Sequence, residues 1–389
     1  MNIKGVTGKT ILDTRGYKTI CIELATDFGK FYASAPNGKS TGKYEAKPYN
    51  KTIFDDINKI KSIKITKIEF ESFDNLNELE NIFLGKVGAN TMIALEYVFL
   101  KALAKKQKKQ VWQLINPYAD KFPSPVGNAI GGGVHSKSSR RPDFQEFLFI
   151  PEVKFGFERA VKVNIRAREN CAEILKNLYK NFTGKRSDEN AWQTRLTNEQ
   201  IMSTMLDVKD NMIDEFCIKI HCGIDVAASQ FYNKYYNYKN PKKRLDKNNQ
   251  IKYMSEIADK FYYLEDPVDE NDFIGFREVK KRARGLIVGD DLTATNLDRI
   301  YKAVRERAIN AVIIKPNQNG SLVEIKKIVE FCKKSNIKMI FSHRSGETSE
   351  DILSDLAFGF QADFIKTGIF GRGRDEKLNR LIEIEKNIK

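Results

Sequence analysis

Apolar positions follow two different rhythms along the chain, and the change between them falls near residue 117. In the first part, short stretches of alternating apolar and polar residues predict strands at 19–24, 31–35 and 65–73. The segment 89–105 carries a long apolar face of helical period, which predicts a helix. We therefore expect residues 1–117 to form a small α+β domain.

From about residue 145 onward, short apolar runs alternate with longer segments of helical period. This alternation is typical of βα units, in which helices join parallel strands. The predicted strands are 147–150, 218–226, 262–267, 286–291, 311–317, 338–345 and 364–367, with helices at 296–307, 321–334 and 350–360. Prolines at 117, 123 and 125 interrupt the chain before this region. We therefore place the domain boundary there and expect residues 118–389 to form the second domain.

Each of the later predicted strands ends in a side chain that can carry charge or chemistry. These residues are Asp225, Glu265, Asp290, Lys315, His343 and Lys366, and most are separated by about the length of one βα unit. In a (β/α) barrel the carboxyl ends of all strands meet at one mouth, where catalytic residues come from several strands. We therefore expect these side chains to share one pocket.

Three carboxylates in that pocket, those of Asp225, Glu265 and Asp290, would repel one another strongly enough to force protonation unless a cation joins them. Oxygen ligands with open positions suit Mg²⁺, and no Cys or His cluster with zinc spacing is present. Lys315 and Lys366 would enter the same pocket, and a lysine beside a metal cation should have a lowered pKa. These residues favour removal of a proton next to a carboxylate, with a metal stabilising the dianion.

The composition carries no membrane or secretion signal. Hydrophobic residues make up 41% and charged residues 30% of the 389 residues, as in an ordinary globular protein. No apolar run reaches the roughly 18 residues of a membrane span, and the start lacks the apolar segment of a signal peptide. The five cysteines are scattered, which is typical of reduced thiols. We therefore expect a cytoplasmic protein without a membrane segment.

The chain is basic, with 66 Lys and Arg against 51 Asp and Glu and a formal net charge of +15. Basic clusters at 105–109, 242–244 and 280–284 could contact the phosphates of a nucleic acid. They fall on different predicted elements and have little aromatic interleaving. We therefore favour a solvated basic surface over a nucleic-acid interface.

A set of short motifs runs through the whole chain in a fixed order. They are ILDTRG at 11–16, NGKSTG at 37–42, GGGVH at 131–135, QEF at 145–147, LEDP at 264–267, GDDLT at 289–293, IKPNQ at 314–318, SHRSGET at 342–348 and IKTG at 365–368. Together they resemble the enolase family, the phosphopyruvate hydratases, and its archaeal members in particular. The resemblance implies an α/β fold with a small N-terminal α+β domain and an atypical enolase-type (β/α)8 barrel similar to a TIM barrel.

The same resemblance implies an activity, the reversible dehydration of 2-phosphoglycerate to phosphoenolpyruvate with two Mg²⁺ ions per active site, in a homodimer or larger homo-oligomer. Lys315 matches the general base, Glu189 the general acid and Glu146 the carboxylate partner of that acid. Asp225, Glu265 and Asp290 match the ligands of the first metal, and Ser40 matches a ligand of the second. Arg344 and Ser345 match a clamp for the phosphate, and Lys366 matches the residue that neutralises the substrate carboxylate. His135, Gln145 and His343 match groups that close over the substrate.

Two alternative functions stay open on the sequence alone. A relative of enolase could remove the same kind of proton from another carboxylate, although it would not need the phosphate clamp of Arg344 and Ser345. An enolase-like scaffold could instead bind RNA or a protein, although it would not need metal ligands. Glu189 is followed by Asn190 and Ala191 where the family has two glycines, which mildly favours the scaffold because the loop could sit differently.

Overall fold

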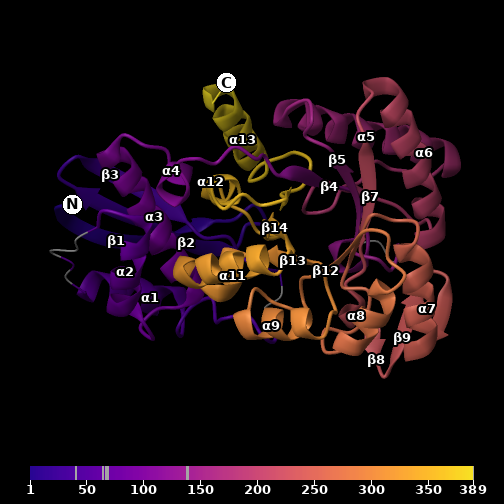
Figure 1. Cartoon of the computed structure of the whole chain (residues 1–389), viewed down its shortest axis with the longest axis horizontal. Coiled ribbons are helices and arrows are strands. Elements are labelled where there is room, and N and C mark those ends of the chain that lie inside the picture. Colours follow the sequence, from indigo (N-terminus) through magenta and orange to yellow (C-terminus); the bar gives the residue numbers. More distant parts are fainter. Residues whose placement is uncertain (40–41, 64, 66–69, 137–139, 389) are drawn as a thin grey trace.

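The computed structural model describes residues 1–39, 42–63, 65, 70–136 and 140–388. The N-terminal part, at the left of Figure 1, is a three-stranded antiparallel sheet with helices beside it. Its strands are β1 (Ile3–Leu12), β2 (Lys18–Thr26) and β3 (Gly29–Ser34), and its helices are α1 (Ile53–Ser62), α2 (Leu76–Phe83), α3 (Ala89–Gln107) and α4 (Val111–Ile115). Alternation along β2 places Ile20, Ile22 and Leu24 on one buried face, and α3 contacts this strand.

The strand predicted at 65–73 is wrong at its end. Residues 66–69 lie outside the described residues, and Phe73 begins a short 3-10 helix, Phe73–Asn75. The side-chain oxygen of Asn75 accepts hydrogen bonds from the backbone N–H of Ser72 at 3.0 Å and of Glu71 at 3.1 Å. This local capping satisfies the backbone without a partner strand, so the apolar alternation does not decide the structure there.

The rest of the described chain forms an α/β barrel, at the right of Figure 1. In the described part, eight strands close it, namely β4 (Ser124–Gly131), β5 (Glu146–Pro151), β7 (Ile220–Asp225), β11 (Tyr263–Glu265), β12 (Leu286–Gly289), β13 (Ala311–Ile314), β14 (Lys338–Ser342) and β15 (Phe364–Lys366). Each strand pairs with the next, and β15 pairs back to β4. The expected fold, a small α+β domain followed by an atypical (β/α)8 barrel, is confirmed.

One strand of the barrel runs against its neighbours. β5 is antiparallel to both β4 and β7, and two helices, α5 (Phe157–Leu178) and α6 (Asn198–Phe216), follow it before β7 begins. Because of this reversal, Glu146, the first residue of β5, is in register with Asp225, the last residue of β7. Side chains at the start of β5 therefore lie at the same mouth of the barrel as side chains at the ends of the other strands.

The apolar pattern did not predict β4. Prolines at 123 and 125 indicate a break, but Pro125 is the second residue of this strand and lies in register with Ile365 of β15. A proline is tolerated close to the start of a strand, where the loss of its N–H removes few ladder hydrogen bonds. A short strand, β6 (Trp192–Gln193), pairs with β4 and is an additional strand of the same sheet.

Helices and a small sheet complete the barrel. The helices are α7 (Lys247–Ala258), α8 (Phe273–Lys280), α9 (Leu297–Arg305), α10 (Pro316–Asn319), α11 (Leu322–Lys334), α12 (Ile352–Gly359) and α13 (Asp375–Ile388), and the small sheet consists of β8 (Tyr232–Asn233), β9 (Tyr235–Lys239) and β10 (Lys242–Leu245). A separate apolar cluster fills the barrel interior with Val126, Leu148, Ile150, Tyr263, Leu286, Val288, Ala311, Ile313, Ile340 and Phe364. Because the interior is packed, chemistry has to take place at the strand ends.

The N-terminal part covers one side of the barrel through contacts between distant segments. α4 contacts α12, and α3 contacts α10. The rings of Trp112 and Phe358 meet edge to face with their centroids 5.1 Å apart. The side-chain amide of Asn317 donates a hydrogen bond to that of Asn90 at 3.0 Å. The loops of the N-terminal part are thereby brought to the mouth of the barrel.

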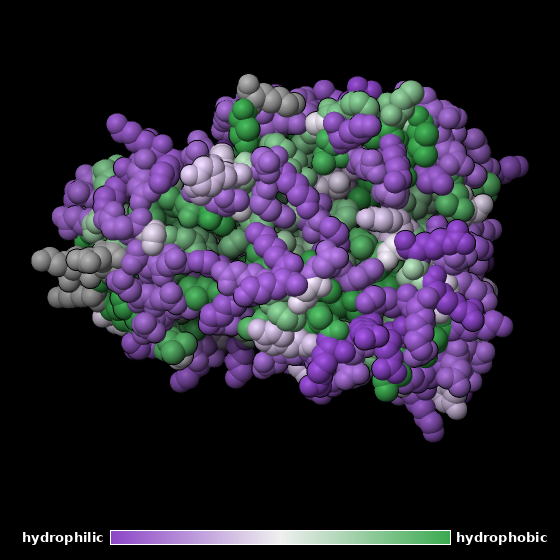
Figure 2. All heavy atoms as spheres, in the orientation of Figure 1, coloured by the Kyte–Doolittle hydropathy of each residue, from purple (hydrophilic) through white to green (hydrophobic). Residues whose placement is uncertain are grey.

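Hydrophilic residues cover most of the face shown in Figure 2, with smaller hydrophobic areas between them. Exposed large apolar side chains such as Tyr17, Leu84 and Tyr118 come from different segments of the chain. Among the described residues, no helix has both the length and the apolar character needed to cross a membrane.

The C-terminal helix is anchored to the barrel by a carboxylate that caps another helix. Both oxygens of buried Glu385 in α13 accept hydrogen bonds at the start of α5, from the backbone N–H of Phe157 at 2.9 Å and of Glu158 at 3.1 Å. We expect Glu385→Ala to lower the free energy of unfolding by about 1–2 kcal/mol, because it removes the acceptor of these two backbone N–H groups. Urea unfolding measures this change.

Glu383 in the same helix provides a matched control. Its side chain is 58% exposed and pairs with Arg380 at 3.0 Å, so Glu383→Ala should change the free energy of unfolding by less than about 0.5 kcal/mol. Equal losses in the two variants would contradict the capping role of Glu385.

Candidate active site

The ends of the barrel strands surround one cavity that collects most of the residues singled out from the sequence. Its lining includes His135, Gln145, Glu146, Glu189, Asp225, Asp290, Lys315, His343, Arg344, Ser345 and Lys366. Glu265, fully buried at the end of β11, lies behind this lining and contacts Lys366. Ser40 lies outside the described residues.

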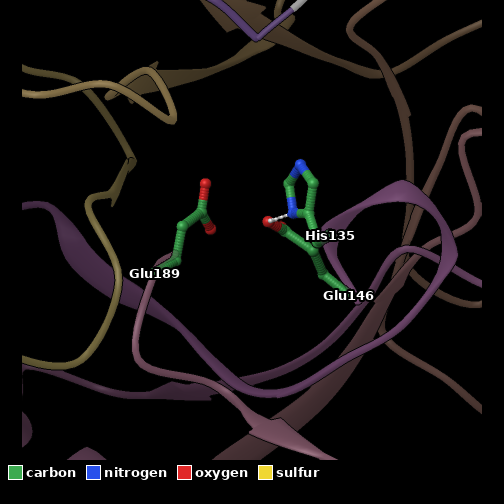
Figure 3. Close-up of side chains that lie close together, drawn as sticks. All are labelled: His135, Glu146 and Glu189. Atoms are coloured by element: carbon green, nitrogen blue, oxygen red, sulfur yellow. Dashed lines mark ion pairs between the residues drawn. The ribbon is translucent and has the colours of Figure 1, made fainter. Parts of the chain in front are cut away.

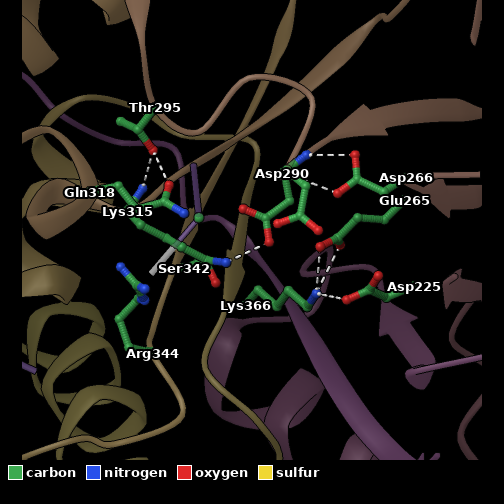
Figure 4. A network of polar contacts seen from close by, with 12 residues as sticks. Asp225, Glu265, Asp266, Asp290, Thr295, Lys315, Gln318, Ser342, Arg344 and Lys366 are labelled. Carbon is green, nitrogen blue, oxygen red and sulfur yellow. Dashed lines mark hydrogen bonds and ion pairs between the residues drawn. The ribbon is translucent and has the colours of Figure 1, made fainter. Parts of the chain in front are cut away.

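Lys366 lies among acidic side chains at the end of β15 (Figure 4). Its Nζ is 3.1 Å from Oδ2 of Asp225, 2.8 Å from Oε2 of Glu265 and 2.9 Å from Oε2 of Glu146. Burial alone would lower the pKa of Lys366, but these carboxylates raise it well above the ordinary value. These carboxylates therefore favour the charged form of Lys366 at the base of the cavity.

The carboxylates around Lys366 are only partly compensated. Burial raises the pKa of Asp225, and burial together with repulsion from Asp225 raises the pKa of Glu265 well above its usual range. Oδ1 of Asp290 is buried and has no hydrogen-bond partner among the described residues. Buried anionic oxygens of this kind are the ligands that a hard divalent cation binds. The residues present therefore fit the metal site expected from the sequence.

Two further acids lie next to this group. Asp266 accepts hydrogen bonds from the backbone N–H of Asp290 at 3.2 Å and of Asp291 at 2.6 Å. One carboxylate oxygen of each of these three residues lies within 4.8 Å of the others. Burial, and then repulsion from Asp290, raises the pKa of Asp291 to about 7. The hydrogen bonds of Asp266 fix the turn that carries Asp290.

Lys315 directly follows β13 and forms an ion pair with Asp290 (Figure 4). Its backbone N–H donates to Oγ1 of Thr295 at 3.0 Å, and the Thr295 hydroxyl donates to Gln318 at 2.7 Å. No pattern in the sequence singled out Thr295. Burial lowers the pKa of Lys315, but Asp290 outweighs this effect and the pKa lies above its ordinary value. The protein groups alone therefore do not produce the lowered pKa expected beside a metal.

A second polar cluster consists of His135, Glu146 and Glu189 (Figure 3). One nitrogen or carboxylate oxygen of each lies within 4.8 Å of the others, and Nδ1 of His135 is 3.3 Å from Oε1 of Glu146. Around the barrel, β5 and β13 are separated by β7, β11 and β12 in one direction and by β4, β15 and β14 in the other. Glu146 and Lys315 therefore approach the cavity from opposite walls.

The groups of this second cluster differ in their affinity for protons. Burial raises the pKa of Glu189, but His135 and Arg374 bring it down to about 2. Burial lowers the pKa of His135, but Glu189 and Glu146 raise it above the ordinary value. His343, whose Nε2 is 3.7 Å from Oε2 of Glu189, has a pKa well below its usual range because it is buried and lies near Arg374. This arrangement favours an ionised Glu189 beside a protonated His135.

The loop that carries Glu189 keeps a glycine-like backbone without glycine. Asn190 has a φ of 63°, in the left-handed region that Asn tolerates better than most residues. Its side chain donates to the carbonyl of Phe370 at 3.1 Å, and its own carbonyl accepts two hydrogen bonds from Arg168 at 2.9 and 2.7 Å. Oγ of Ser187 also accepts from the backbone N–H of Glu189 at 3.2 Å. The Asn–Ala pair is therefore compatible with an ordered acid loop.

Arg344 and Ser345 lie in the loop that follows β14. Nη2 of Arg344 is 2.9 Å from Oε2 of Glu45, and Nη1 donates to the side-chain oxygen of Asn317 at 3.1 Å. Oγ of Ser345 is buried and has no hydrogen-bond partner among the residues that the structure describes. The sequence did not indicate Glu45 as a partner of Arg344. This loop thus brings a guanidinium and a hydroxyl group to the lining of the cavity.

Gln145 and the loop before Ser40 complete the rim. Nε2 of Gln145 donates to Oδ2 of Asp225 at 3.1 Å. Nζ of Lys39 donates to the carbonyl of Val134 at 2.8 Å. The segment that leads to Ser40 is therefore tied to the segment that carries His135.

Comparison with known proteins gives the same family for both parts of the chain. Residues 3–115 match the family model of the enolase N-terminal domain, and residues 119–389 match that of the enolase C-terminal TIM barrel domain. Among curated proteins, the enolase of Archaeoglobus fulgidus is 35% identical over 395 residues, which cover 99% of this chain and 97% of the relative.

Two further archaeal relatives agree. The enolase of Methanocorpusculum labreanum is 35% identical over 402 residues, covering 99% of both chains. That of Methanosphaera stadtmanae is 32% identical over 406 residues, covering 99% of this chain and 97% of the relative. With both family models matched and relatives aligned over nearly their full length, the chain belongs to the enolase family, the hydro-lyases known as phosphopyruvate hydratases.

Proposed function

We propose that the protein catalyses the reversible dehydration of 2-phosphoglycerate to phosphoenolpyruvate in glycolysis and gluconeogenesis. The observation that carries the proposal is the position of a lysine and a carboxylate cluster on opposite walls of one cavity. Removal of a proton next to a carboxylate needs a base, and expulsion of the neighbouring hydroxyl needs an acid. Lys315 is the base and Glu189 is the acid in this proposal.

On the base side, Lys315 takes the proton from carbon 2. Its ion pair with Asp290 fixes the direction of the amine, and the hydrogen bond from its backbone to Thr295 fixes the start of the side chain. Lys366 remains charged between its carboxylates and neutralises the carboxylate of the substrate. The two lysines thus have separate tasks.

On the acid side, Glu189 delivers a proton to the departing 3-hydroxyl, with Glu146 as its partner. His135 lies beside these two acids, with one ring nitrogen within 4.8 Å of a carboxylate oxygen of each, and they raise its pKa. Gln145 and His343 line the same cavity and help to enclose the substrate.

We propose Mg²⁺ as the cofactor, with two ions per active site. Asp225, Glu265 and Asp290 would hold the first ion, and Ser40 would contribute to the second. Bound there, the ions would stabilise negative charge on the substrate. They would also weaken the attraction of Asp290 for the ammonium group of Lys315, which lowers the pKa of Lys315 and favours its neutral amine. Oδ1 of Asp290, which is buried and has no hydrogen-bond partner in the described part of the chain, supports this assignment.

Arg344 and Ser345 favour a phosphorylated substrate over that of an enzyme acting on another carboxylate. A guanidinium can bind two phosphate oxygens at once, and the buried hydroxyl of Ser345 has no partner among the described residues. A scaffold that only binds RNA or a protein is less favoured, because it would leave the buried acids and lysines of the cavity without a task.

Ultraviolet absorbance of the enol double bond tests the reaction and its metal requirement together. We expect product from 2-phosphoglycerate with Mg²⁺, a loss of at least about 100-fold with a chelator, and recovery when Mg²⁺ is added back. Product that persists with the chelator would contradict the metal assignment. A folded protein that forms no product with Mg²⁺ would contradict the proposed reaction, and other carboxylates and RNA would then be screened.

We also propose that the chain divides into domains at residues 1–117 and 118–389. The homodimer or larger homo-oligomer and the cytoplasmic location stay predictions that rest on the resemblance and the composition. Nucleic-acid binding by the basic surface stays the less favoured alternative.

A further inference from the structure

A buried arginine that the sequence did not single out lies behind the phosphate-binding loop, the name used here for residues 344–347. Arg374, just before α13, is 1% exposed. In the described part of the chain, its guanidinium donates only to uncharged oxygens, those of Thr14, Ser345 and Arg372. A buried cation without an ion pair is costly, so its hydrogen bonds call for a specific explanation.

Two of these hydrogen bonds connect the loop to the N-terminal part. Nη2 of Arg374 donates to the carbonyl of Ser345 at 3.1 Å, and Nη1 donates to Oγ1 of Thr14 at 3.2 Å. Ser345 lines the cavity, and its Oγ has no partner among the described residues. Arg374 therefore holds the backbone of Ser345 and leaves the hydroxyl available.

Thr14 fixes the other end of the loop. Its Oγ1 accepts from the backbone N–H of Glu347 at 3.1 Å, and its own N–H donates to the carbonyl of Glu347 at 2.8 Å. Between these points, Gly346 exchanges two backbone hydrogen bonds with Asn37, at 2.7 and 3.0 Å. A Cβ atom at Gly346 would lie 2.2 Å from Oδ2 of Asp13. The loop thus lies directly against the N-terminal part.

The backbone of Arg344 is held by α13 through Glu347. Its N–H donates to Oε1 of Glu347 at 2.8 Å. The other carboxylate oxygen of Glu347 is 2.7 Å from Nζ of Lys377 in α13. Each residue of the phosphate-binding loop is therefore held by a polar contact to α13, to the residue before α13 or to the N-terminal part.

We propose that Arg374, together with Thr14, is a positioning residue that sets where Arg344 and Ser345 meet the phosphate of the substrate. This inference rests on the proposed function, because it requires a phosphorylated substrate. Loss of the contact from Arg374 would displace Ser345 from the phosphate, while Lys315 keeps its contacts to Asp290 and Thr295. The effect therefore falls on KM rather than on kcat.

The test compares Arg374→Lys with Arg380→Lys, which lies in the helix that follows Arg374, α13. Lysine keeps the charge but loses the planar fork of donors. Arg380 is also largely buried and binds Asp355 through two contacts of 2.8 Å, but in the described part of the chain its partners do not include the phosphate-binding loop. We expect Arg374→Lys to raise the KM for 2-phosphoglycerate about tenfold or more with kcat within about threefold. Arg380→Lys should leave KM unchanged, even if it lowers stability.

A second pair of variants covers the case in which Arg374→Lys does not fold. Thr14→Val should raise KM because it removes the hydroxyl that binds Arg374 and Glu347. Thr19→Val removes a hydroxyl of the same domain that donates to the carbonyl of Ala35 at 2.7 Å, and it should leave KM unchanged. Equal KM values for these two variants would overturn the role of Thr14.

A double variant shows whether Arg374 acts through Ser345. Ser345→Ala should raise KM by itself, and combining it with Arg374→Lys should raise KM by less than the product of the single effects, because the two residues are in direct contact. Effects that multiply, or an unchanged KM in Arg374→Lys, would overturn the inference while the wild-type enzyme still forms product. A wild-type enzyme that forms no product would overturn the proposed function itself.

Discussion

Lys315→Ala is expected to abolish exchange of the carbon-2 proton of 2-phosphoglycerate with solvent and to lower turnover by about 10³-fold or more. The other lysine at the base of the cavity, Lys366, is held by Asp225, Glu265 and Glu146 and stays charged, so it does not replace the lost base. Loss of the carbon-2 proton signal in heavy water, followed by nuclear magnetic resonance, measures the exchange. Ultraviolet absorbance measures the turnover.

Lys280→Ala is the matched control for removing a lysine from the barrel. Lys280 in α8 is half-buried and donates to the carbonyl of Ile309 at 2.7 Å, away from the cavity. Its removal should leave proton exchange unchanged. Exchange at the wild-type rate in Lys315→Ala would mean that another group is the base.

Glu189→Gln is expected to separate the two halves of the reaction. The amide is nearly the same size as the carboxylic acid but does not deliver a proton to the 3-hydroxyl, so product formation should fall by about 10²- to 10³-fold. Because Lys315 is on the opposite wall of the cavity, part of the carbon-2 exchange should remain. The same two measurements, exchange and absorbance, follow the two steps in one sample.

Asp188→Asn tests whether any carboxylate of this loop would have the same effect. Oδ2 of Asp188 is 3.7 Å from Nζ of Lys39 at the rim, and the change from carboxylate to amide is the same as in Glu189→Gln. We expect close to wild-type product formation. Exchange lost to the same extent in Glu189→Gln and in Lys315→Ala would contradict the division between acid and base.

The part of the site that the sequence predicts best lies at the carboxyl ends of the regular βα units. Asp290, Lys315 and Lys366 could be placed at one mouth because their strands are short apolar runs about one βα unit apart, and parallel strands present their ends on the same side. The same argument predicts the barrel itself. It needs no knowledge of side-chain contacts.

The remaining site residues lie in segments where the local sequence pattern does not predict that their side chains reach the cavity. Glu146 is at the start of a strand, and only the reversal of β5, seen in the sheet order, brings it to the mouth. Glu189 is in a loop whose shape depends on the left-handed backbone of Asn190 and on contacts from Arg168. Arg374 contacts Ser345 although the two residues are far apart in the sequence, and no periodicity of the sequence predicts such a contact.

The reversed strand also decides which stretches of the chain border the substrate. Because β5 runs from the mouth to the far end of the barrel, the described residues between β4 and β5, 132–136 and 140–145, lie at the open end. The connection from β5 to α5, residues 152–156, emerges at the closed end, where Glu152 pairs with Lys219. Length changes in the first connection would reshape access for new substrates, whereas insertions in the second would be remote from catalysis. In the other βα units the connection after the strand lies at the mouth. Sequence changes that alter specificity are therefore expected before β5 but after every other barrel strand.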